Sequence, residues 1–300
     1  MNALRYSFKR RKMEQRIVAF FAALCLLAGV YLPAAADHSF LPARAEKERP
    51  ELDEVRVYLR DMLSGRGYIN NGEIFMSLSE FSGLYGINMN LSADDEGFAA
   101  VAEGLDISAA SGANYLTANY RYVFLPDGYI LCGGDVYLPA DALSRIFGVK
   151  LSASEDRVDI STKQCRPISG SEDYYKLNMP PDYQYWIPRI IKVETVDEPL
   201  AGKIAVGNVI ENRVESDRYP DSIYKVLYDN NTGVQFAPAT TGALTAAGDE
   251  LSWVAACLCW EGYDTAEDSL YFANPENNGN YWFKTYCVYV KTIGRHEFYK

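Results

Sequence analysis

The carboxyl group of Glu194 has the sequence surroundings of an acid that could donate a proton. Apolar residues before it predict a helix over residues 188–194, and a second apolar pattern predicts another helix over residues 200–214. The break between these helices places Glu194 at a packed helix end beside a turn, from which its carboxyl group could enter a cleft. The pattern alone favours the other interpretation, in which Glu194 is a solvated glutamate.

The turn after Glu194 and the helix that follows it must position this acid. Asp197 and Glu198 stand where the second helix begins, near the positive end of its dipole, and Pro199 suits its first turn. One face of this helix is expected to be buried, because apolar residues recur along it at helical spacing. They are Ala201, Ile204, Ala205, Val209 and Ile210.

The start of the chain has the composition of an export signal. Basic residues up to Arg16 precede an apolar run over residues 17–36, which ends in three alanines before Asp37. Residues 1–36 are therefore expected to be a signal peptide or, because the run is long, a membrane anchor. In either case the rest of the chain is expected to be exported. The formal net charge of −11 argues against nucleic acid as a partner.

The sequence gives little support for a metal site or a disulfide framework. Of six cysteines, one lies in the leader, and the other five are an odd, scattered set. These five are Cys132, Cys165, Cys257, Cys259 and Cys287. They are expected to be small core residues. With two histidines in the chain, His38 and His296, no zinc site and no cofactor are predicted.

A repeat defines the first predicted domain. Residues 74–87 and 136–149 share a pattern of a short apolar strand, a capped helix and a final glycine, Gly86 or Gly148. Further short strands complete a small duplicated α/β-mixed domain over residues 55–163. An exposed, charged linker is predicted before it.

The second predicted domain follows a connector. The linker before the repeat covers residues 37–54, and a stretch rich in Ser, Gly and Pro predicts a connector over residues 164–182. Residues 183–300 then form the C-terminal domain, and the fold class of the whole is α+β. After its first two helices, a helix is predicted over residues 223–228, capped by Ser222 or Asp221, and a loop over residues 235–238. A helix over residues 249–262 is predicted to turn Leu251 inward. Strands are predicted over residues 270–275 and, at the end of the chain, over residues 288–299.

The duplicated pattern over residues 55–163 resembles the copper amine oxidase N-terminal-like domain of many secreted bacterial proteins. The name implies no copper here, because this segment contains no histidine. The resemblance implies a scaffold or wall-binding domain.

The C-terminal part is similar to the spore cortex-lytic, SleB-type family of cell wall hydrolases. Its motifs occur in the family's order: Val193-Glu194, Glu198-Pro199, residues 202–206, Asn212-Arg213-Val214, Tyr219-Pro220, Gln235-Phe236, Tyr271-Phe272, Asn274-Pro275, Ile293-Gly294 and His296-Glu297-Phe298-Tyr299. The resemblance covers about residues 182–299. It implies a lysozyme-like α+β domain that cuts peptidoglycan glycan strands in the cell wall or, during germination, in the spore cortex.

The resemblance also implies that Glu194 is the catalytic acid, although the chain departs from the family beside it. The family has Ala-x-Gly after this glutamate, where this chain has Thr195-Val196-Asp197. Asp197 in place of glycine is expected to remove the freedom to adopt a positive φ and to add a second negative charge. A catalytically impaired wall-binding protein on the same fold is therefore the alternative function.

Cleavage of a glycosidic bond needs a proton on the leaving oxygen, so Glu194 must be protonated near neutral pH. An apolar wall that includes Val193, or a like charge from Asp197 or Glu198, would raise the pKa of Glu194, as burial does in lysozyme. Hydrolysis would need a second carboxylate, and the sequence identifies none. The family's single essential glutamate implies lytic transglycosylation, in which the 6-hydroxyl of the muramic sugar attacks C1 and leaves a 1,6-anhydro end.

Further candidates could bind the sugars through ring stacking or through hydrogen bonds to N-acetyl groups. They are Gln235, Tyr271, Phe272, Asn274 and His296. Each has a structural alternative. Phe272 could be a core residue, and Asn274 could form the turn before Pro275. For His296, a hydrogen-bonded structural role is favoured over a proton shuttle.

Overall fold

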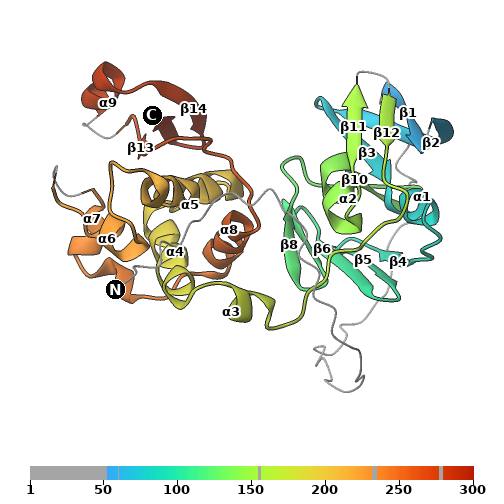
Figure 1. Cartoon of the computed structure of the whole chain (residues 1–300), viewed down its shortest axis with the longest axis horizontal. Helices are drawn as coiled ribbons and strands as arrows, with labels where there is room; N and C mark the ends of the chain where they lie inside the picture. Colours follow the sequence, from blue (N-terminus) through green and yellow to red (C-terminus); the bar gives the residue numbers. More distant parts are fainter. Residues whose placement is uncertain (1–52, 60, 155–156, 232–234, 277–279) are drawn as a thin grey trace, which may run out of the picture.

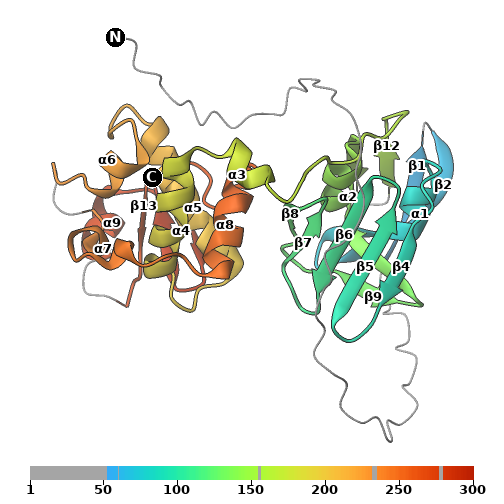
Figure 2. The same cartoon turned by 90° about the horizontal axis from the view of Figure 1, so that it is seen from below.

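The structure of the protein is a computed structural model, which describes residues 53–59, 61–154, 157–231, 235–276 and 280–300 (Figure 1). The predicted leader over residues 1–36 lies outside the described residues, as does almost all of the predicted linker. Within the described part, no helix has both the length and the apolar composition needed to cross a membrane. The predicted α+β class is confirmed, with a β-rich N-terminal unit and a helical C-terminal unit (Figure 2).

Two sheets make up the described part of the N-terminal unit. One has the strand order β11-β12-β1-β2-β3-β10-β9 and the other β4-β5-β6-β7-β8. Neighbours are antiparallel, except that β1 and β12 pair in parallel. The first sheet consists of β1 (Asp53–Leu59), β2 (Met62–Asn70), β3 (Glu73–Ser77), β9 (Ile130–Cys132), β10 (Asp135–Pro139), β11 (Leu151–Ser154) and β12 (Arg157–Ile160). The second consists of β4 (Asn90–Ala93), β5 (Gly97–Ala102), β6 (Leu105–Ala110), β7 (Tyr115–Ala118) and β8 (Arg121–Phe124). Helices α1 (Leu78–Gly83) and α2 (Ala140–Phe147) follow β3 and β10.

The predicted repeat is confirmed as two strand–helix units, β3–α1 and β10–α2, whose strands pair with each other. Both helices turn their apolar faces into one core, where the ring centroids of Phe81 and Phe147 lie 5.2 Å apart. Ser77 caps α1 as expected, because its side chain accepts a hydrogen bond from the backbone. The expected side-chain cap of α2 is wrong, since Pro139 precedes this helix and has no capping group.

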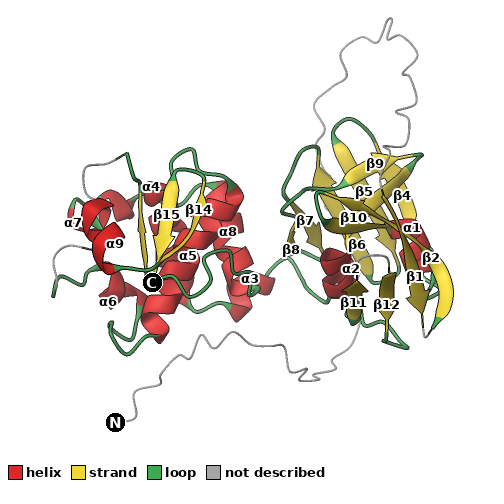
Figure 3. Ribbon diagram, turned by 90° about the horizontal axis from the view of Figure 1, so that it is seen from above, coloured by secondary structure: helices red, strands yellow, loops and turns green. Residues whose placement is uncertain are grey.

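The C-terminal unit is built around α5, which packs against α4, α6 and α8 (Figure 1). A small sheet in the order β13-β15-β14 lies beside these helices (Figure 3). The helical elements are α3 (Tyr174–Asn178), α4 (Pro181–Glu194), α5 (Leu200–Glu215), α6 (Ile223–Leu227), α7 (Ala237–Thr240), the 3-10 helix η1 (Ala243–Thr245), α8 (Glu250–Trp260) and α9 (Asn280–Tyr286). The strands are β13 (Tyr271–Ala273), β14 (Tyr289–Ile293) and β15 (His296–Tyr299).

Helix α4 ends at Glu194 as predicted, but it begins at Pro181 and not at residue 188. Pro188 lies inside the helix, where it removes one backbone donor. The turns before Pro188 are held by packing, because Tyr183 is fully buried and its hydroxyl lies 2.6 Å from a carboxylate oxygen of Glu211.

Helix α5 is buried on nearly every side, and not on one face as predicted, because helices surround it. Its closest neighbour is α8: a Cβ added to Gly207 would lie 2.6 Å from the Sγ atom of Cys259. Only glycine permits this approach of the two helices.

Three smaller expectations also need correction. The predicted loop over residues 235–238 contains the start of α7, and the predicted final strand is two strands, β14 and β15, joined by a turn at Gly294. Leu251 is 37% exposed and not inward, although Val254 and Leu258 on the same helix are buried as expected. Ser222 is confirmed as the cap of α6.

A buried ion pair joins the two units. The guanidinium group of Arg121, on β8, forms two hydrogen bonds with the carboxylate of Glu261, just after α8, at 2.9 and 2.5 Å. Their side chains are only 11% and 3% exposed. The hydroxyl of Tyr175 donates to the same carboxylate at 3.0 Å, and Arg145 donates to the backbone oxygen of Glu261 at 2.9 Å. The contact therefore fixes β8 against α8.

Arg121→Met should strongly destabilise the protein, because it leaves the carboxylate of Glu261 buried without its cation. We expect a loss of about 3–5 kcal/mol in the free energy of unfolding, measured by chemical denaturation. Arg66→Met is the control, because the ion pair of Arg66 with Glu54 is exposed, and its removal should cost less than about 1 kcal/mol. Equal losses in the two variants would contradict the structural role of the buried pair.

Candidate functional site

Glu194 is the last residue of α4, and its side chain is partly buried. Burial raises the pKa of its carboxyl group to about 7, while the positive charge of Arg213 acts in the opposite direction. Among the described residues, none forms a hydrogen bond with this carboxyl group. The acid is therefore close to half-protonated at neutral pH and is free to bind another molecule. The sequence pattern favoured a solvated glutamate, and the structure places it in a partly buried position instead.

The turn after Glu194 is fixed by buried hydrogen bonds. The backbone N–H of Thr195 donates to the carbonyl oxygen of Ile191 at 3.0 Å. The ammonium group of Lys203, on α5, donates to the carbonyl oxygen of Thr195 at 2.8 Å and to its hydroxyl at 3.1 Å. These contacts tie the end of α4 to α5, so the position of Glu194 depends on both helices.

Asp197 takes the conformation that it was expected to forbid. Its φ is 59°, in the left-handed region that aspartate tolerates better than most residues. Its side chain is 81% exposed and lies 3.6 Å from the guanidinium group of Arg295. The expectation that aspartate at this position cannot adopt a positive φ is therefore wrong.

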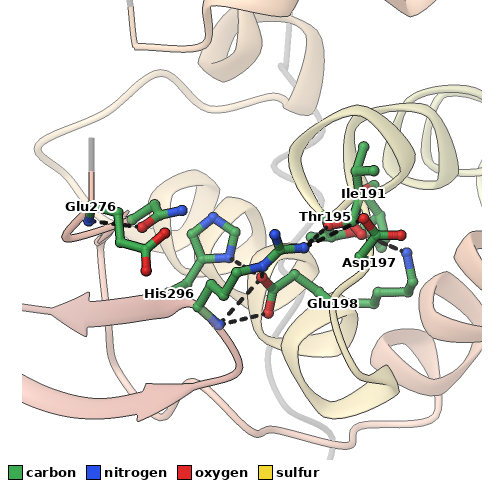
Figure 4. A network of polar contacts seen from close by, with 10 residues as sticks. Ile191, Thr195, Asp197, Glu198, Glu276 and His296 are labelled. Atoms are coloured by element: carbon green, nitrogen blue, oxygen red, sulfur yellow. Dashed lines mark hydrogen bonds and ion pairs between the residues drawn. The ribbon is translucent and has the colours of Figure 1, made fainter. Parts of the chain in front are cut away.

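Glu198 is buried and contacts the turn between β14 and β15. Its carboxylate accepts a hydrogen bond from the backbone N–H of Arg295 at 3.1 Å and lies 3.6 Å from Nδ1 of His296 (Figure 4). The chain passes so close that a Cβ on Gly294 would lie 1.9 Å from this carboxylate. The raised pKa of Glu194 comes from burial, and the expected contribution of a like charge from Asp197 or Glu198 is wrong.

Arg213 connects the parts of the site, although the sequence pattern predicted no role for it. It lies on α5 and is buried, and its Nε donates to the carbonyl oxygen of Leu270 at 2.7 Å. Its guanidinium carbon lies 5.0 Å from the ring centroid of Tyr219, 4.9 Å from that of Phe236 and 5.6 Å from that of Tyr271. Its Nη1 atom is buried and has no hydrogen-bond partner among the described residues.

A cation in this position is notable because its charge is balanced mainly by aromatic rings. Burial lowers the pKa of Arg213, and the negative charges of Asp229 and Glu194 oppose that effect. Cation–π contacts with desolvated rings offset part of the cost of burial. The signal that could have found this residue is an arginine in a helix whose other residues are mostly apolar.

The predicted sugar-binding residues fall into two groups. Tyr271 lies against Arg213, as does Phe236 next to Gln235, and Gln235 itself is partly buried. Phe272 packs 6.3 Å from Phe236 and is partly buried, so it belongs to the aromatic lining of this region. These residues therefore gather around the guanidinium that also influences Glu194.

Asn274 and His296 make up the second group. The Oδ1 atom of Asn274 accepts a hydrogen bond from the backbone N–H of Glu276 at 2.9 Å, which is the turn-forming role. The ring of His296 lies 5.4 Å from that of Phe272, and Figure 4 shows it between Glu198 and Glu276. The favoured hydrogen-bonded role of His296 is not fulfilled at Nδ1, which is buried without a hydrogen-bond partner among the described residues.

Over the described ranges, no group of three or more His, Cys, Asp or Glu side chains is arranged to hold a metal ion. The groups that the site offers for chemistry are the carboxyl group of Glu194, the guanidinium group of Arg213 and the aromatic rings around it.

Comparison with known families assigns both units. Residues 197–299 match the sequence model of the family described as Cell Wall Hydrolase. The C-terminal unit contains a cell wall hydrolase domain. Residues 60–162 match the family described as Copper amine oxidase N-terminal domain. Both resemblances inferred from the sequence are confirmed. Glu194 precedes the matched range of the cell wall hydrolase domain, so its catalytic role stays a prediction.

Several curated proteins are similar to this cell wall hydrolase domain. A spore cortex-lytic enzyme of Bacillus cereus is 30% identical over 107 residues, which cover 36% of this chain and 40% of the relative. That of Bacillus subtilis (strain 168) is 29% identical over 105 residues, which cover 35% of this chain and 33% of the relative. The chain thus spans less than half the length of these relatives. A solved structure, the catalytic domain of the germination-specific lytic transglycosylase SleB from Bacillus anthracis, is 26% identical with a TM-score of 0.38, covering 41% of this chain and 98% of that one.

Glu194→Gln should stabilise the protein at alkaline pH. The folded-state pKa of about 7 lies above the ordinary value of 4.5, so the folded state binds this proton more tightly. Stability therefore falls as the pH rises from 4.5 to 7, and glutamine removes that loss. In urea denaturation, the free energy of unfolding of the variant should be higher than that of the wild type by up to about 3 kcal/mol at pH 8. At pH 4 the two free energies should be nearly equal. Glu103→Gln, at an exposed position, is the control and should show no such pH dependence. A gain at pH 8 no larger than at pH 4 would contradict the raised pKa.

Asp197→Gly should leave the site almost unchanged. Glycine adopts a positive φ without strain, but it loses more conformational entropy on folding than aspartate does. Because these effects oppose each other, the free energy of unfolding should change by less than about 1 kcal/mol. The titration midpoint of Glu194, followed by NMR of its carboxyl carbon, should not move. A clear fall of that midpoint in the variant would show that the charge of Asp197 does act on Glu194.

Proposed function

We propose that this protein is an exported peptidoglycan-degrading enzyme that cleaves glycan strands as a lytic transglycosylase, with Glu194 as general acid and then general base. The observation that carries the proposal is the partly buried carboxyl group of Glu194, with a pKa of about 7, three residues before the matched range of a cell wall hydrolase domain. The curated relatives of this domain are spore cortex-lytic enzymes, so the spore cortex is the first candidate substrate and the vegetative cell wall the second.

The first step uses the protonated form of Glu194. Near pH 7 a large fraction of this carboxyl group carries its proton, which it can give to the glycosidic oxygen as the bond to C1 of the muramic sugar breaks. Partial burial favours the uncharged acid before the reaction. The leaving sugar departs as an alcohol, and Glu194 becomes a carboxylate.

The second step uses that carboxylate as a base. The 6-hydroxyl of the same muramic sugar attacks C1, and Glu194 takes the hydroxyl proton, so the products are a 1,6-anhydro end and a regenerated acid. The positive charge of Arg213 stabilises the carboxylate between the two steps. A pKa near 7 suits both proton transfers, because the group must be an acid first and a base afterwards.

Hydrolysis would need a second available carboxylate, and three acidic residues that follow Glu194 have other partners. Asp197 lies 3.6 Å from the guanidinium group of Arg295. Glu198 is bound by the turn at Arg295. Glu211 is buried against the hydroxyl of Tyr183 and the amide of Asn208. This supports transglycosylation with a single glutamate over a hydrolytic mechanism.

The alternative of an impaired wall-binding protein was motivated by Thr195-Val196-Asp197. Asp197 adopts a positive φ and its carboxylate lies 3.6 Å from the guanidinium group of Arg295, so the part of that reason that concerns Asp197 is removed. Export to the cell wall or the extracellular space remains part of the proposal, and it depends on the leader over residues 1–36.

Digestion of purified peptidoglycan by wild type and by Glu194→Gln tests the proposal. Wild type should release 1,6-anhydro-muramic ends, detected by mass spectrometry, and its rate should fall as the pH rises through about 7, because the carboxyl group loses its proton. Glu194→Gln should lower the rate by about 10²- to 10⁴-fold. Reducing ends in place of anhydro ends would overturn transglycosylation, and no product from wild type on either cortex or vegetative wall would overturn the enzymatic function.

A further inference from the structure

Four aromatic rings form a continuous row that begins beside Arg213 and ends at the surface of α9. This aromatic row consists of Tyr219, Tyr271, Trp282 and Tyr286. Successive ring centroids lie 6.4, 5.8 and 5.8 Å apart. The first ring lies 5.0 Å from the guanidinium carbon of Arg213, the cation that acts on Glu194. The row therefore connects the proposed catalytic position with a surface formed by a different helix.

The outer half of the aromatic row is exposed. Trp282 is 48% exposed and Tyr286 is 71% exposed, and the neighbouring Tyr281 is 82% exposed. The other side of α9 is held in place, because the ring of Phe283 stacks on that of Tyr299 at 5.6 Å. A helix that packs on one side and presents several large aromatic side chains to solvent on the other is typical of an interaction surface.

The chemistry of the aromatic row suits amino sugars. Tyrosine and tryptophan offer a flat apolar ring together with a polar group at its edge, which matches a pyranose ring with its C–H faces and its hydroxyl and acetamido edges. A polar contact accompanies the rings, because Arg218 donates to the hydroxyl of Tyr271 at 2.7 Å. Lys284 on α9 is 58% exposed and lies 3.8 Å from the carboxylate of Glu297.

We propose that the aromatic row is a set of sugar-binding subsites that carries a peptidoglycan glycan strand from Glu194 outward across α9. The proposal rests on the proposed function of the same domain, and it adds a direction for the strand and a preference for long strands. Tyr271 is the ring shared by the two regions, because it contacts both Arg213 and Trp282.

A lipid surface is the other occupant that exposed aromatic residues suggest, and the charge argues against it. Anionic bilayers attract basic surfaces, whereas this chain has 29 basic and 40 acidic residues. The phenolic hydroxyl groups of the row also favour a hydrogen-bonding ligand over lipid tails. A glycan strand is therefore the occupant to which the structure points.

Binding can be measured separately from cleavage by placing every variant in the full chain with Glu194→Gln. The probes are long glycan strands stripped of their peptides and a tetrasaccharide cut from them. The combined substitution of Trp282→Ala and Tyr286→Ala should weaken binding of the long strands about tenfold, and the preference for long strands over the tetrasaccharide should disappear. Tyr286→Ala alone should give part of this loss without disturbing the fold, because that side chain is largely exposed.

Tyr224→Ala is the matched control. Tyr224 is 52% exposed on α6, in a second aromatic cluster with Trp186 and Tyr228. The Tyr224→Ala variant should bind the long strands and the tetrasaccharide as tightly as the parent chain does. The proposal is overturned if the α9 variants bind long strands as tightly as the parent chain, if Tyr224→Ala loses as much affinity, or if the chain binds anionic lipid vesicles and not the strands. Failure of the proposed function shows separately, as a wild-type chain that binds strands but releases no anhydro ends.

Discussion

The buried guanidinium group of Arg213 is the interaction on which the arrangement of the site depends. A charge inside a protein must be matched by partners, since its removal from water is costly. For Arg213 the partners are the carbonyl oxygen of Leu270 and the faces of three rings, which come from three separate segments of the chain. Because each segment must reach the same cation, the loops after α5 and the strand β13 converge on one point of α5.

The same guanidinium group gives Glu194 its intermediate acidity. Burial alone would hold this carboxyl group uncharged over a wide pH range, and a direct ion pair would hold it ionised. Arg213 exerts a favourable field without a hydrogen bond to Glu194, so the pKa settles at about 7. The hydrogen bonds of Lys203 to Thr195 fix the end of α4. The acidity of the site is thus a property of two packed helices and not of one residue.

The sequence predicted the features that depend on local patterns. The end of α4 at Glu194, the cap of α6 at Ser222 and the duplicated strand–helix units follow from spacing, caps and turn residues. Predictions from the sequence were wrong where tertiary packing determines the structure. Pro188 suggested the start of a helix, but the turns before it are buried and helical, so α4 begins at Pro181. The partners of Arg213 lie on distant segments, so its motif could be noticed but its role could not be derived.

The accessory unit is part of the same physical framework. The ion pair between Arg121 and Glu261 and the hydroxyl of Tyr175 form one buried polar network where β8 meets α8. Helix α8 also lies directly against α5, with Gly207 and Cys259 at their closest approach. The packing is therefore continuous from the β-rich unit to the helix that carries Arg213.

The left-handed backbone of Asp197 bears on how related sequences are sorted. What this position demands is a torsion angle, and the chain meets that demand with a residue other than glycine. A sequence search that takes the absence of glycine at this position as a sign of an inactive enzyme would discard this chain. A search that admits aspartate and asparagine there, since both tolerate such a backbone, would retain it.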